Sequence, residues 1–315
     1  MEDSRRWRPA PCLFVKQEVG QLLAASLRPL PLGGSSLRAM TAAMDHFDLD
    51  SYLRRIEYAA ARRPTRAVLH ELHLAHACHI PFENIDPLLG RPVRLDLGSL
   101  QGKLVQARRG GYCFEQNTLF AAVLETVGFR VTRLAARVRL GATRVLARTH
   151  MLLKVELDDA LWIVDVGFGA GGLLQPVPLV SGPVVQQSHW TYRAVEEGGL
   201  WVLQALRGGA WQDLYAFTTE PQYAVDFEMA NHFTSTYPES VFVRMLTAQL
   251  TSPEAHYCLR NREYVVEQGA QSNRRTLSDE EVRQVLVDPF GLELPPETIA
   301  AVLRSLPPHP SQPEA

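Results

Sequence analysis

The hydrophobic period of the chain changes near Gly128, and this change limits the folds that the sequence can form. Between Asp48 and Gly128, apolar residues recur every three or four positions, as on one face of an α-helix. From Phe129 onwards, short runs of β-type residues alternate with Asp, Gly and Pro. We therefore predict an α+β fold, with a helical first part and a central antiparallel sheet or barrel.

Caps and breakers give the bounds of the predicted helices. The first helix carries its apolar residues at Leu49, Leu53, Ile56 and Ala60. A second helix begins after Thr65, whose hydroxyl can cap it, and runs to about His79, where Pro81 ends it. After a loop rich in Pro, Gly and Asp, a third helix follows Gly110-Gly111 and is closed by Gly128.

The rest of the chain mixes strands with a few helices. The predicted strands of the middle third are 129–138, 149–157, 161–168, 189–195 and 200–206. Beyond Asn231 we predict a helix over 240–247, strand-like segments over 257–266 and a last helix after Ser278. Ser278 and Glu281 have the spacing of a capping box, which fixes where that helix begins. Its buried face consists of Val282, Val285 and Leu286.

Composition excludes several classes of protein. The 315 residues carry 32 Lys and Arg against 34 Asp and Glu, so no overall positive charge attracts nucleic acid or anionic lipid. The cysteines, Cys12, Cys78, Cys113 and Cys258, form no CxxC pair, which disfavours a disulfide framework or a structural zinc site. We expect a cytoplasmic, reducing setting. The most apolar N-terminal stretch, 19–27, is too short to span a membrane.

The two ends of the sequence differ from the middle. Residues 1–43 contain a Pro/Gly/Ser-rich stretch and show no hydrophobic period, so we predict an unstructured extension, or a true start at Met40 or Met44. Residues 306–315 include four prolines and are predicted to form a disordered tail.

Cys113 is the strongest candidate for a reactive side chain. It follows Gly110-Gly111 and begins the third helix, where unpaired N–H groups and the positive end of the helix dipole favour a thiolate. Arg108 and Arg109 add cations nearby in the sequence. Because the thiolate is the nucleophilic form of cysteine, we interpret Cys113 as a nucleophile. A buried structural cysteine is the alternative.

A cysteine nucleophile needs a base, and the base needs a group that orients it. His150 and Asp165 lie on a predicted hairpin that turns at Asp158-Asp159. In this register His150 faces Gly167 and Leu152 faces Asp165, so His150 and Asp165 are diagonal neighbours on one face. A loop one residue longer would send them to opposite faces, and His150 would then be an ordinary polar residue on a strand.

Three segments resemble the signature segments of the arylamine N-acetyltransferases, in the same order and with similar gaps. They are Arg109-Gly110-Gly111-Tyr112-Cys113-Phe114-Glu115-Gln116-Asn117, Thr149-His150-Met151 and Val164-Asp165-Val166-Gly167-Phe168-Gly169. Two further segments, Pro81-Phe82-Glu83-Asn84 and Ser235-Thr236-Tyr237-Pro238 with Phe242, resemble other motifs of that family. The resemblance runs from about Asp45 to Leu303, and residues 1–43 have no counterpart in the family's usual chain.

The resemblance implies three domains around a cysteine-protease-like core. A helical domain over 44–130 would carry the cysteine, and a β-barrel domain over 131–230 would carry the histidine and the aspartate. A smaller α/β domain over 231–305 would form a lid. These boundaries are expectations from the family.

The resemblance also implies an activity and a site. The family's catalytic triad maps onto Cys113, His150 and Asp165. The family's aromatic acceptor pocket maps onto Phe82, Phe168 and Phe242, with Phe114 at a neighbouring position, and its coenzyme A contacts near the cysteine map onto Thr149, Phe168 and Gly169. The implied reaction is acetyl transfer from acetyl-CoA to an aromatic amine or hydrazine. Acetyl-CoA is then a co-substrate; no bound cofactor, metal, nucleic acid or membrane is implied, and the oligomeric state is open.

Other interpretations are weaker. A triad of this kind also serves an amide synthase or a cysteine hydrolase, and a catalytically silent binding module is the alternative from another class. His70, His73, His76 and His79 recur every third residue on the second helix, but such a spacing spreads them around the helix, so we predict a polar helix face and no metal site. The glycines over 167–172 lack the Lys-Ser/Thr of a phosphate-binding loop.

Overall fold

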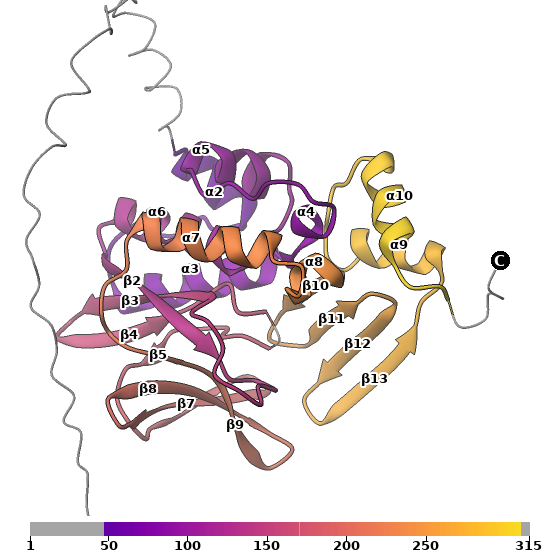
Figure 1. The fold of residues 1–315 in the computed structure, drawn as a ribbon. Helices are drawn as coiled ribbons and strands as arrows, with labels where there is room; N and C mark the ends of the chain where they lie inside the picture. Colours follow the sequence, from indigo (N-terminus) through magenta and orange to yellow (C-terminus); the bar gives the residue numbers. More distant parts are fainter. Residues whose placement is uncertain (1–46, 170, 310–315) are drawn as a thin grey trace, which may run out of the picture. The chain divides into compact units, whose positions relative to one another are not determined.

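A computed structural model describes residues 47–169 and 171–309, and its fold is α+β. Within these ranges, the helices of the first part precede an antiparallel sheet of eight strands, and the strands after it join one early strand in a sheet of five strands (Figure 1). The predicted extension over 1–43, the alternative starts at Met40 and Met44, and Cys12 lie outside the described residues, as do residues 310–315 of the predicted tail. Among the helices in the described ranges, none combines the length and the apolar character needed to span a membrane.

Three helices of the first part follow the predicted caps closely. They are α2 (Leu49–Arg55), α3 (Arg66–His79) and α6 (Cys113–Val127). The cap at Thr65 is confirmed, because its hydroxyl accepts a hydrogen bond from the Val68 backbone N–H. Gly128 closes α6 in the left-handed region, with φ of 105°. α2 ends before Ala60 because Glu57 has φ of 56°, which a right-handed helix cannot contain.

The connection predicted as a loop between Pro81 and Arg108 is partly helical. It contains the short strand β1 (Phe82–Glu83), the helices α4 (Ile85–Leu88) and α5 (Leu97–Leu100), and the π-helix η1 (Gln101–Gln106). The Glu83 backbone N–H donates to the Gly111 carbonyl, so β1 lies beside the start of α6. This contact brings the Pro81-Phe82-Glu83-Asn84 segment next to Cys113.

The larger sheet forms a nearly closed barrel. Its strands are β2 (Arg130–Val138), β3 (His150–Leu157), β4 (Ala160–Val164), β5 (Val177–Pro178), β6 (Val184–Gln187), β7 (Trp190–Glu197), β8 (Leu200–Arg207) and β9 (Ala210–Phe217). The spatial order is β5-β4-β3-β2-β9-β8-β7-β6. Shortly after β5, Ser181 forms an isolated bridge with Ala194 of β7, which brings the two ends of the sheet together. Leu134, Leu152, Leu203 and Tyr215 are among the side chains that fill the interior.

The hairpin on which the site prediction depends has the expected register. Leu153 pairs with Val164, and the turn at Asp158-Asp159 has positive φ at both residues. β4 ends at Val164, earlier than predicted, so Asp165 is the first residue beyond the sheet ladder. Strands β5, β6 and β9 were not predicted; in β9, Gln212 and Asp213 interrupt the apolar pattern.

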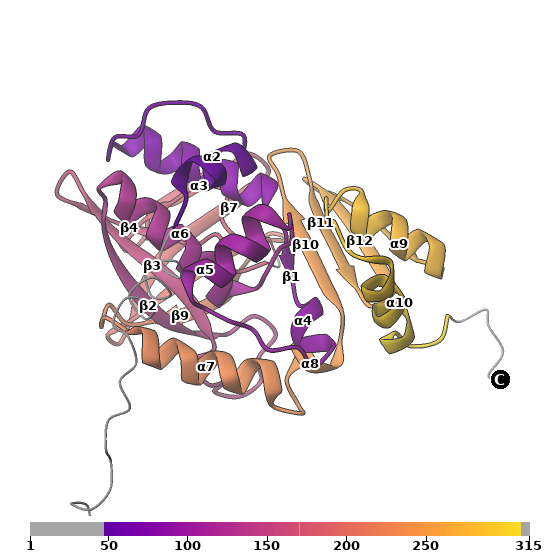
Figure 2. The ribbon, with the colours of Figure 1, turned by 90° about the horizontal axis from the view of Figure 1, so that it is seen from above.

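The smaller sheet and the last helices form the third part of the described chain. The sheet order is β1-β10-β11-β12-β13, with β10 (Thr247–Thr251), β11 (His256–Arg260), β12 (Glu263–Gln268) and β13 (Gln271–Thr276). The helices are α7 (Ala224–Thr236), α8 (Val241–Arg244), α9 (Asp279–Val287) and α10 (Pro296–Ser305). Figure 2 shows α9 and α10 beside this sheet, and their apolar side chains share a core with β10 to β12.

Several details of this third part differ from the prediction. The capping box is confirmed, because the Ser278 backbone N–H donates to Glu281 and the Glu281 N–H donates to the Ser278 hydroxyl. α9 is not the last helix, since α10 follows it. The segment 257–266 is a hairpin that turns at Asn261, where φ is 50°. The predicted helix over 240–247 is only α8, because Thr247 already begins β10. α7 was not predicted and runs across the expected domain boundary at residue 230.

Candidate active site

Cys113 occupies the first position of α6 and is 3% exposed. The two glycines before it are required by close packing, since a Cβ on Gly110 would lie 2.1 Å from the Pro81 carbonyl oxygen. The Glu115 carboxylate accepts the Tyr112 backbone N–H, which completes the start of the helix. The Cys113 sulfur lies 3.6 Å from the Thr149 carbonyl oxygen. The thiol therefore faces the chain that leads into β3.

The arginines before Cys113 do not face the thiol. Arg109 donates twice to one oxygen of Glu83, over 2.6 and 2.9 Å, and Arg108 pairs with Glu293 over 2.9 Å. The expectation that these cations act on the sulfur is therefore not met, because buried and surface carboxylates bind both of them. The cation near the thiol comes from another part of the chain.

The cationic group near the thiol is the imidazole of His150, the first residue of β3. Its Nε2 lies 2.7 Å from Oδ2 of Asp165, and both side chains are almost fully buried. A carboxylate only accepts, so Nε2 carries the proton of this bond. Nδ1 is then the ring nitrogen left for Cys113, which lines the same cavity as His150. The structure thus brings His150 next to Asp165, as the hairpin register predicts, and places Cys113 in the same cavity wall as His150.

The two buried partners shift each other's pKa in opposite directions. Burial disfavours the charged form of His150, but the Asp165 carboxylate and hydrogen bonds to Asp165 and Cys113 outweigh it and raise the pKa of His150 to about 10. Burial also opposes ionisation of Asp165, yet His150 and further hydrogen bonds hold the pKa of Asp165 below its ordinary value. The pair is therefore an imidazolium next to a carboxylate at neutral pH.

Asn117 orients the carboxylate of Asp165, and no role was predicted for it. Its side-chain amide donates to Asp165 Oδ1 over 2.9 Å and to the Met151 carbonyl over 2.8 Å, and its oxygen accepts the Val166 N–H. A sequence signal existed, because residues four apart on a helix share a face and Asn117 follows Cys113 by four. The Gly167 N–H is a further donor to Asp165, over 3.0 Å.

Cys113 and His150 open into a cavity of about 330 Å³. Its walls include Cys113, His150, Thr149, Phe82, Phe168 and Phe242, together with Val138, Leu140, Met245 and Arg260, which had not been singled out. Phe82 and Phe242 are in ring contact, with centroids 5.8 Å apart. Most of the residues expected to bind the acceptor and the coenzyme therefore meet around the sulfur.

Two of the residues expected to bind the acceptor or the coenzyme do not line this cavity. Phe114 is fully buried and packs its ring against Tyr112 and Phe227. The reason is helical geometry, since consecutive residues of α6 point about 100° apart and Phe114 faces the core when Cys113 faces the cavity. Gly169 has φ of 64° and lies against the ring of Phe82, behind the cavity wall.

Tyr215 of β9 supports the imidazole, and it was also missed. Its ring centroid lies 4.8 Å from that of His150 and 5.1 Å from that of Phe168. Burial, followed by the nearby charge of Asp165, raises the pKa of Tyr215 well above its usual value, so its hydroxyl stays neutral. No sequence signal pointed to Tyr215, because β9 itself lacks a clear strand pattern.

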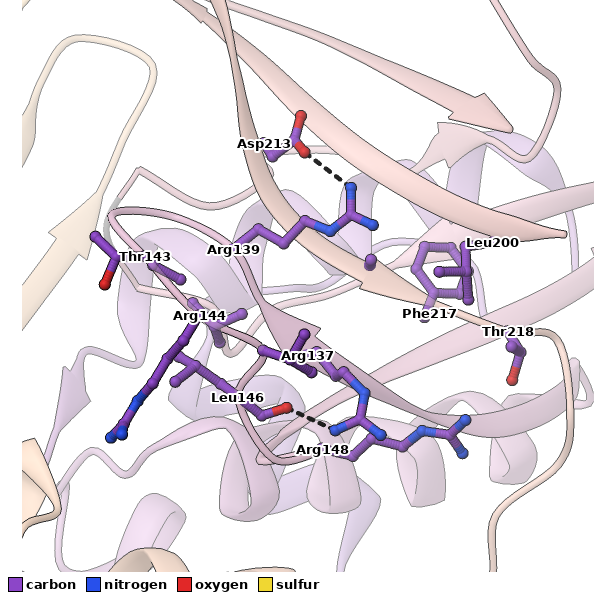
Figure 3. A pocket seen from close by; sticks show the side chains of 14 residues that line it. Arg137, Arg139, Thr143, Arg144, Leu146, Arg148, Leu200, Asp213, Phe217 and Thr218 are labelled. Atoms are coloured by element: carbon purple, nitrogen blue, oxygen red, sulfur yellow. Dashed lines mark hydrogen bonds and ion pairs between the residues drawn. The ribbon is translucent and has the colours of Figure 1, made fainter. Parts of the chain in front are cut away.

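Figure 3 shows a larger pocket, of about 540 Å³, whose walls carry Arg137, Arg139, Arg144 and Arg148. Arg139 is 3.0 Å from both Asp213 and Glu197, and Arg137 donates to the Leu146 carbonyl. Val138 lines both this pocket and the one around Cys113. The arginine-lined pocket contains no member of the Cys113, His150 and Asp165 group, so its size does not make it the reaction site.

The histidines of α3 do not form a polar surface. His73 and His76 are fully buried, and burial lowers the pKa of His73 to about 4 and that of His76 to about 3. His79 is partly buried and contacts the Ala75 carbonyl and Glu57. Within residues 47–169 and 171–309, no group of three His, Cys, Asp or Glu side chains could hold a metal ion.

A buried cysteine beside an imidazole–carboxylate pair at an aromatic cavity forms a candidate enzyme site, and comparison with known proteins gives the family. A family model described as N-acetyltransferase matches residues 65–299. The arylamine N-acetyltransferase of Mycolicibacterium smegmatis is 43% identical over 254 residues, which cover 78% of this chain and 92% of that protein. The Escherichia coli K12 enzyme is 41% identical over 254 residues, covering 78% of this chain and 88% of that protein.

Solved structures agree with this result. The crystal structure of Nocardia farcinica arylamine N-acetyltransferase has a TM-score of 0.79 and 43% identity, and the match covers 82% of this chain and 94% of that chain. The Mycobacterium marinum enzyme in complex with CoA has a TM-score of 0.78 and 37% identity, covering 82% and 100% of the respective chains. The chain belongs to the arylamine N-acetyltransferase family and is a transferase.

Proposed function

We propose that this chain transfers an acetyl group from acetyl-CoA to the nitrogen of aromatic amines or hydrazines, through an S-acetyl intermediate on Cys113. The observation that carries the proposal is the hydrogen bond between His150 and Asp165, with Cys113 and His150 together in the wall of one aromatic cavity. The family's named activity, acetyl transfer to arylamines, supports the chemistry.

In the first half-reaction, the thiolate of Cys113 attacks the carbonyl carbon of the acetyl thioester. The new bond joins sulfur to the acetyl carbon, and the bond to the coenzyme sulfur breaks. His150 gives its proton to the departing thiolate, so the coenzyme leaves as a thiol and the imidazole becomes neutral. One thioester replaces another, so the step is close to balanced in free energy. Backbone N–H groups beside Cys113 are donors for the transient oxyanion.

In the second half-reaction, the amine nitrogen attacks the S-acetyl carbon. His150 takes the proton that the nitrogen loses, and Cys113 leaves as a thiolate next to the restored imidazolium. Aromatic amines suit a single base, because their weak basicity keeps the nitrogen unprotonated at neutral pH. The two half-reactions share one site and one enzyme-bound acetyl group, so the kinetics are ping-pong.

The cavity walls suggest how the substrates bind. Phe82, Phe168 and Phe242 offer ring contacts to an aromatic acceptor, worth about 0.5–1.5 kcal/mol beyond simple burial. Thr149 and Phe168 are the coenzyme contacts that we propose next to Cys113, with Gly169 behind them. We also propose the three-domain layout of the family for this chain, with a cysteine-protease-like core and the part after residue 230 as the lid. The complex of a relative with CoA supports acetyl-CoA as the co-substrate.

Replacing Cys113 tests the proposal directly. Cys113→Ser and Cys113→Ala should lose acetyl transfer to a simple aromatic amine and should gain no acetyl group when mixed with acetyl-CoA, as read by intact mass. Cys78→Ser is the matched control, because Cys78 lies on α3 away from the cavity and should leave both readouts unchanged. Turnover that survives in a folded Cys113→Ala variant would refute the assignment of the nucleophile.

The same assay separates the alternatives that use this triad. An amide synthase would acylate Cys113 from a polyketide-like thioester in preference to acetyl-CoA, and a hydrolase would cleave a peptide or amide without any amine acceptor. A binding module would form no acyl adduct with any donor. We expect acetyl-CoA to give the adduct, and an aromatic amine to remove it and yield the N-acetyl product.

A further inference from the structure

Asp165 lies just beyond the end of a strand, so the sheet does not hold its backbone. The last ladder pair on this side is Leu153 with Val164, and the chain then continues through the two described stretches 165–169 and 171–174, which we call the post-β4 segment. This segment carries Asp165 and Phe168, both central to the proposed function. Buried backbone N–H and C=O groups need hydrogen-bond partners, and here side chains provide them.

His73 of α3 bonds both ends of the post-β4 segment. The Asp165 backbone N–H donates to His73 Nε2 over 3.3 Å, and His73 Nδ1 lies 3.0 Å from the Leu174 carbonyl oxygen. Nε2 accepts a proton and Nδ1 faces an acceptor, so these two contacts fix the ring as the neutral Nδ1–H tautomer. Only a neutral histidine offers a donor and an acceptor on opposite sides of one rigid ring.

The surroundings of His73 keep that form in place. The side chain is fully buried and packs edge-on against Phe120, with ring centroids 5.9 Å apart. Burial lowers the pKa of His73 to about 4, so the ring stays uncharged at neutral pH. The imidazole of His73 therefore keeps its acceptor at Nε2 and its donor at Nδ1 at a fixed separation.

Other side chains hold the middle of the post-β4 segment. The Tyr192 hydroxyl lies 2.8 Å from the Gly171 carbonyl oxygen and 2.9 Å from that of Gly172, and the Gly171 N–H donates to His256. These contacts come from β7 and β11. The described parts of the segment are thus fixed from several directions, and among the described side chains His73 is the one that accepts the backbone N–H of Asp165.

We propose that His73 is a positioning residue for acetyl transfer: by joining the Asp165 N–H to the Leu174 carbonyl, it sets where the Asp165 carboxylate meets His150. The inference rests on the proposed function, because it gives Asp165 its role through His150. His73 touches no reacting atom, so its effect is on the geometry of the group that orients the base. Misplacement of such a group by about 1 Å is enough to slow a reaction about 100-fold.

Single substitutions can separate the two bonds of His73. His73→Gln can place an amide oxygen near the position of Nε2 and so keep an acceptor for the Asp165 N–H. His73→Asn can place its amide nitrogen near Nδ1 and so keep only the bond to Leu174. His73→Phe fills the space and removes both bonds. We expect the rate of Cys113 acetylation by acetyl-CoA, followed in a stopped-flow mixer, to fall about 10–100-fold in His73→Phe and His73→Asn, and less in His73→Gln.

A second readout distinguishes positioning from loss of stability. The alkylation rate of Cys113 by iodoacetamide should change its pH profile in His73→Phe and His73→Asn, because a displaced Asp165 no longer supports the imidazolium of His150. Leu69→Ala is the matched control: Leu69 is fully buried on the same helix, and its loss should lower stability without changing the profile.

The outcomes are distinct. If the wild-type chain is acetylated and the Gln variant outperforms the Asn variant at equal folded fraction, the inference holds. If all three variants keep the wild-type acetylation rate and pH profile, or lose rate only in step with their stability as Leu69→Ala does, His73 has no positioning role. If the wild-type chain itself is not acetylated by acetyl-CoA, the proposed function fails and not the inference alone.

Discussion

At the scale of single residues, the site depends on one carboxylate that keeps an imidazole charged. Asp165 accepts hydrogen bonds from His150, Asn117 and the Gly167 N–H, and this arrangement raises the pKa of His150 to about 10. Asp165→Asn keeps the shape but removes the charge and can favour the wrong imidazole tautomer. We expect acetylation of Cys113 to slow by about 10³–10⁴-fold, measured as release of coenzyme thiol in a single turnover.

The pH dependence of the same variant has a defined sign. Without the carboxylate, the pKa of His150 should fall from about 10 towards its ordinary value, so the limb of the pH–rate profile that reports His150 should move to lower pH. Asp213→Asn is the control, because Asp213 pairs with Arg139 in the neighbouring pocket and should leave the profile unchanged. If that limb of the pH–rate profile stays at the wild-type pH in Asp165→Asn, the Asp165 carboxylate does not raise the pKa of His150.

Two phenylalanines allow a matched test of the acceptor pocket. Phe242 lines the cavity around Cys113. Phe114 follows the nucleophile directly in the sequence, but its side chain is buried in the core. We expect Phe242→Leu to raise the KM for an aromatic amine several-fold while the rate of Cys113 acetylation stays within about two-fold. Phe114→Leu should mainly lower thermal stability and leave that KM unchanged. Equal KM shifts in both variants would show that the cavity does not select the acceptor.

At the scale of elements, the start of α6 is held by a buried group of charges behind the catalytic residues. Lys103 of η1 lies 2.6 Å from Asp86 and 2.7 Å from Glu115, and Arg109 pairs with Glu83, whose side chain is fully buried. These ion pairs connect β1, α4 and η1 to the helix that presents Cys113. These buried ion pairs therefore fix the position of the start of α6, which the ion pairs on the protein surface do not do.

Adjacent arginines make this difference measurable. Arg109→Met leaves the buried Glu83 without its main partner, and we expect the free energy of unfolding in urea to fall by about 3 kcal/mol. Arg108→Met removes an exposed pair with Glu293 and should change it by less than about 1 kcal/mol. An equal loss in the free energy of unfolding in the two variants would show that burial of the ion pair does not determine its contribution to stability.

Local sequence signals predicted the elements that carry the proposed triad. The turn at Asp158-Asp159 sets the register of β3 and β4, and Gly128 marks the end of α6, so the hairpin and the helix follow from short-range chemistry. Non-local contacts could not be predicted in this way. His73 shows only a spacing along α3, and its bond to Leu174 exists because the fold brings two distant segments together.

The same reason explains what was missed or misplaced at the site. Phe114 follows the nucleophile in sequence but faces the core, because only packing decides which side of α6 meets the cavity. Met245 and Arg260 reach the cavity from the third part of the chain, and Tyr215 reaches His150 from β9. The family resemblance indicated which residues belong to the site. Where their side chains point depends on how the whole chain packs.

At the scale of the whole molecule, buried histidines give stability a maximum near neutral pH. His73 and His76 have lowered pKa values, about 4 and about 3, so the unfolded chain binds more protons and stability falls as the pH drops from about 6.5 towards these values. His150 has a raised pKa of about 10, so its contribution is present below about 6.5 and is lost as the pH rises towards 10. The buried core histidines therefore lower stability on the acid side of neutral pH, and His150 lowers it on the alkaline side.

His76 offers a way to measure the acid side of this balance. Its ring bonds the Tyr52 hydroxyl over 2.7 Å and Gln116 Oε1 over 3.0 Å, and burial lowers its pKa to about 3, so it stays neutral inside the core. Between pH 7 and pH 5, a histidine with such a lowered pKa costs up to about 2 kcal/mol of stability, and a residue that does not titrate costs none. The pH-dependent loss in urea unfolding should thus be smaller by up to this amount in His76→Gln than in the wild-type chain. Leu72→Ala, on the same helix, should lower stability equally at both pH values, and a His76→Gln variant with the full wild-type loss would assign the acid sensitivity to other groups.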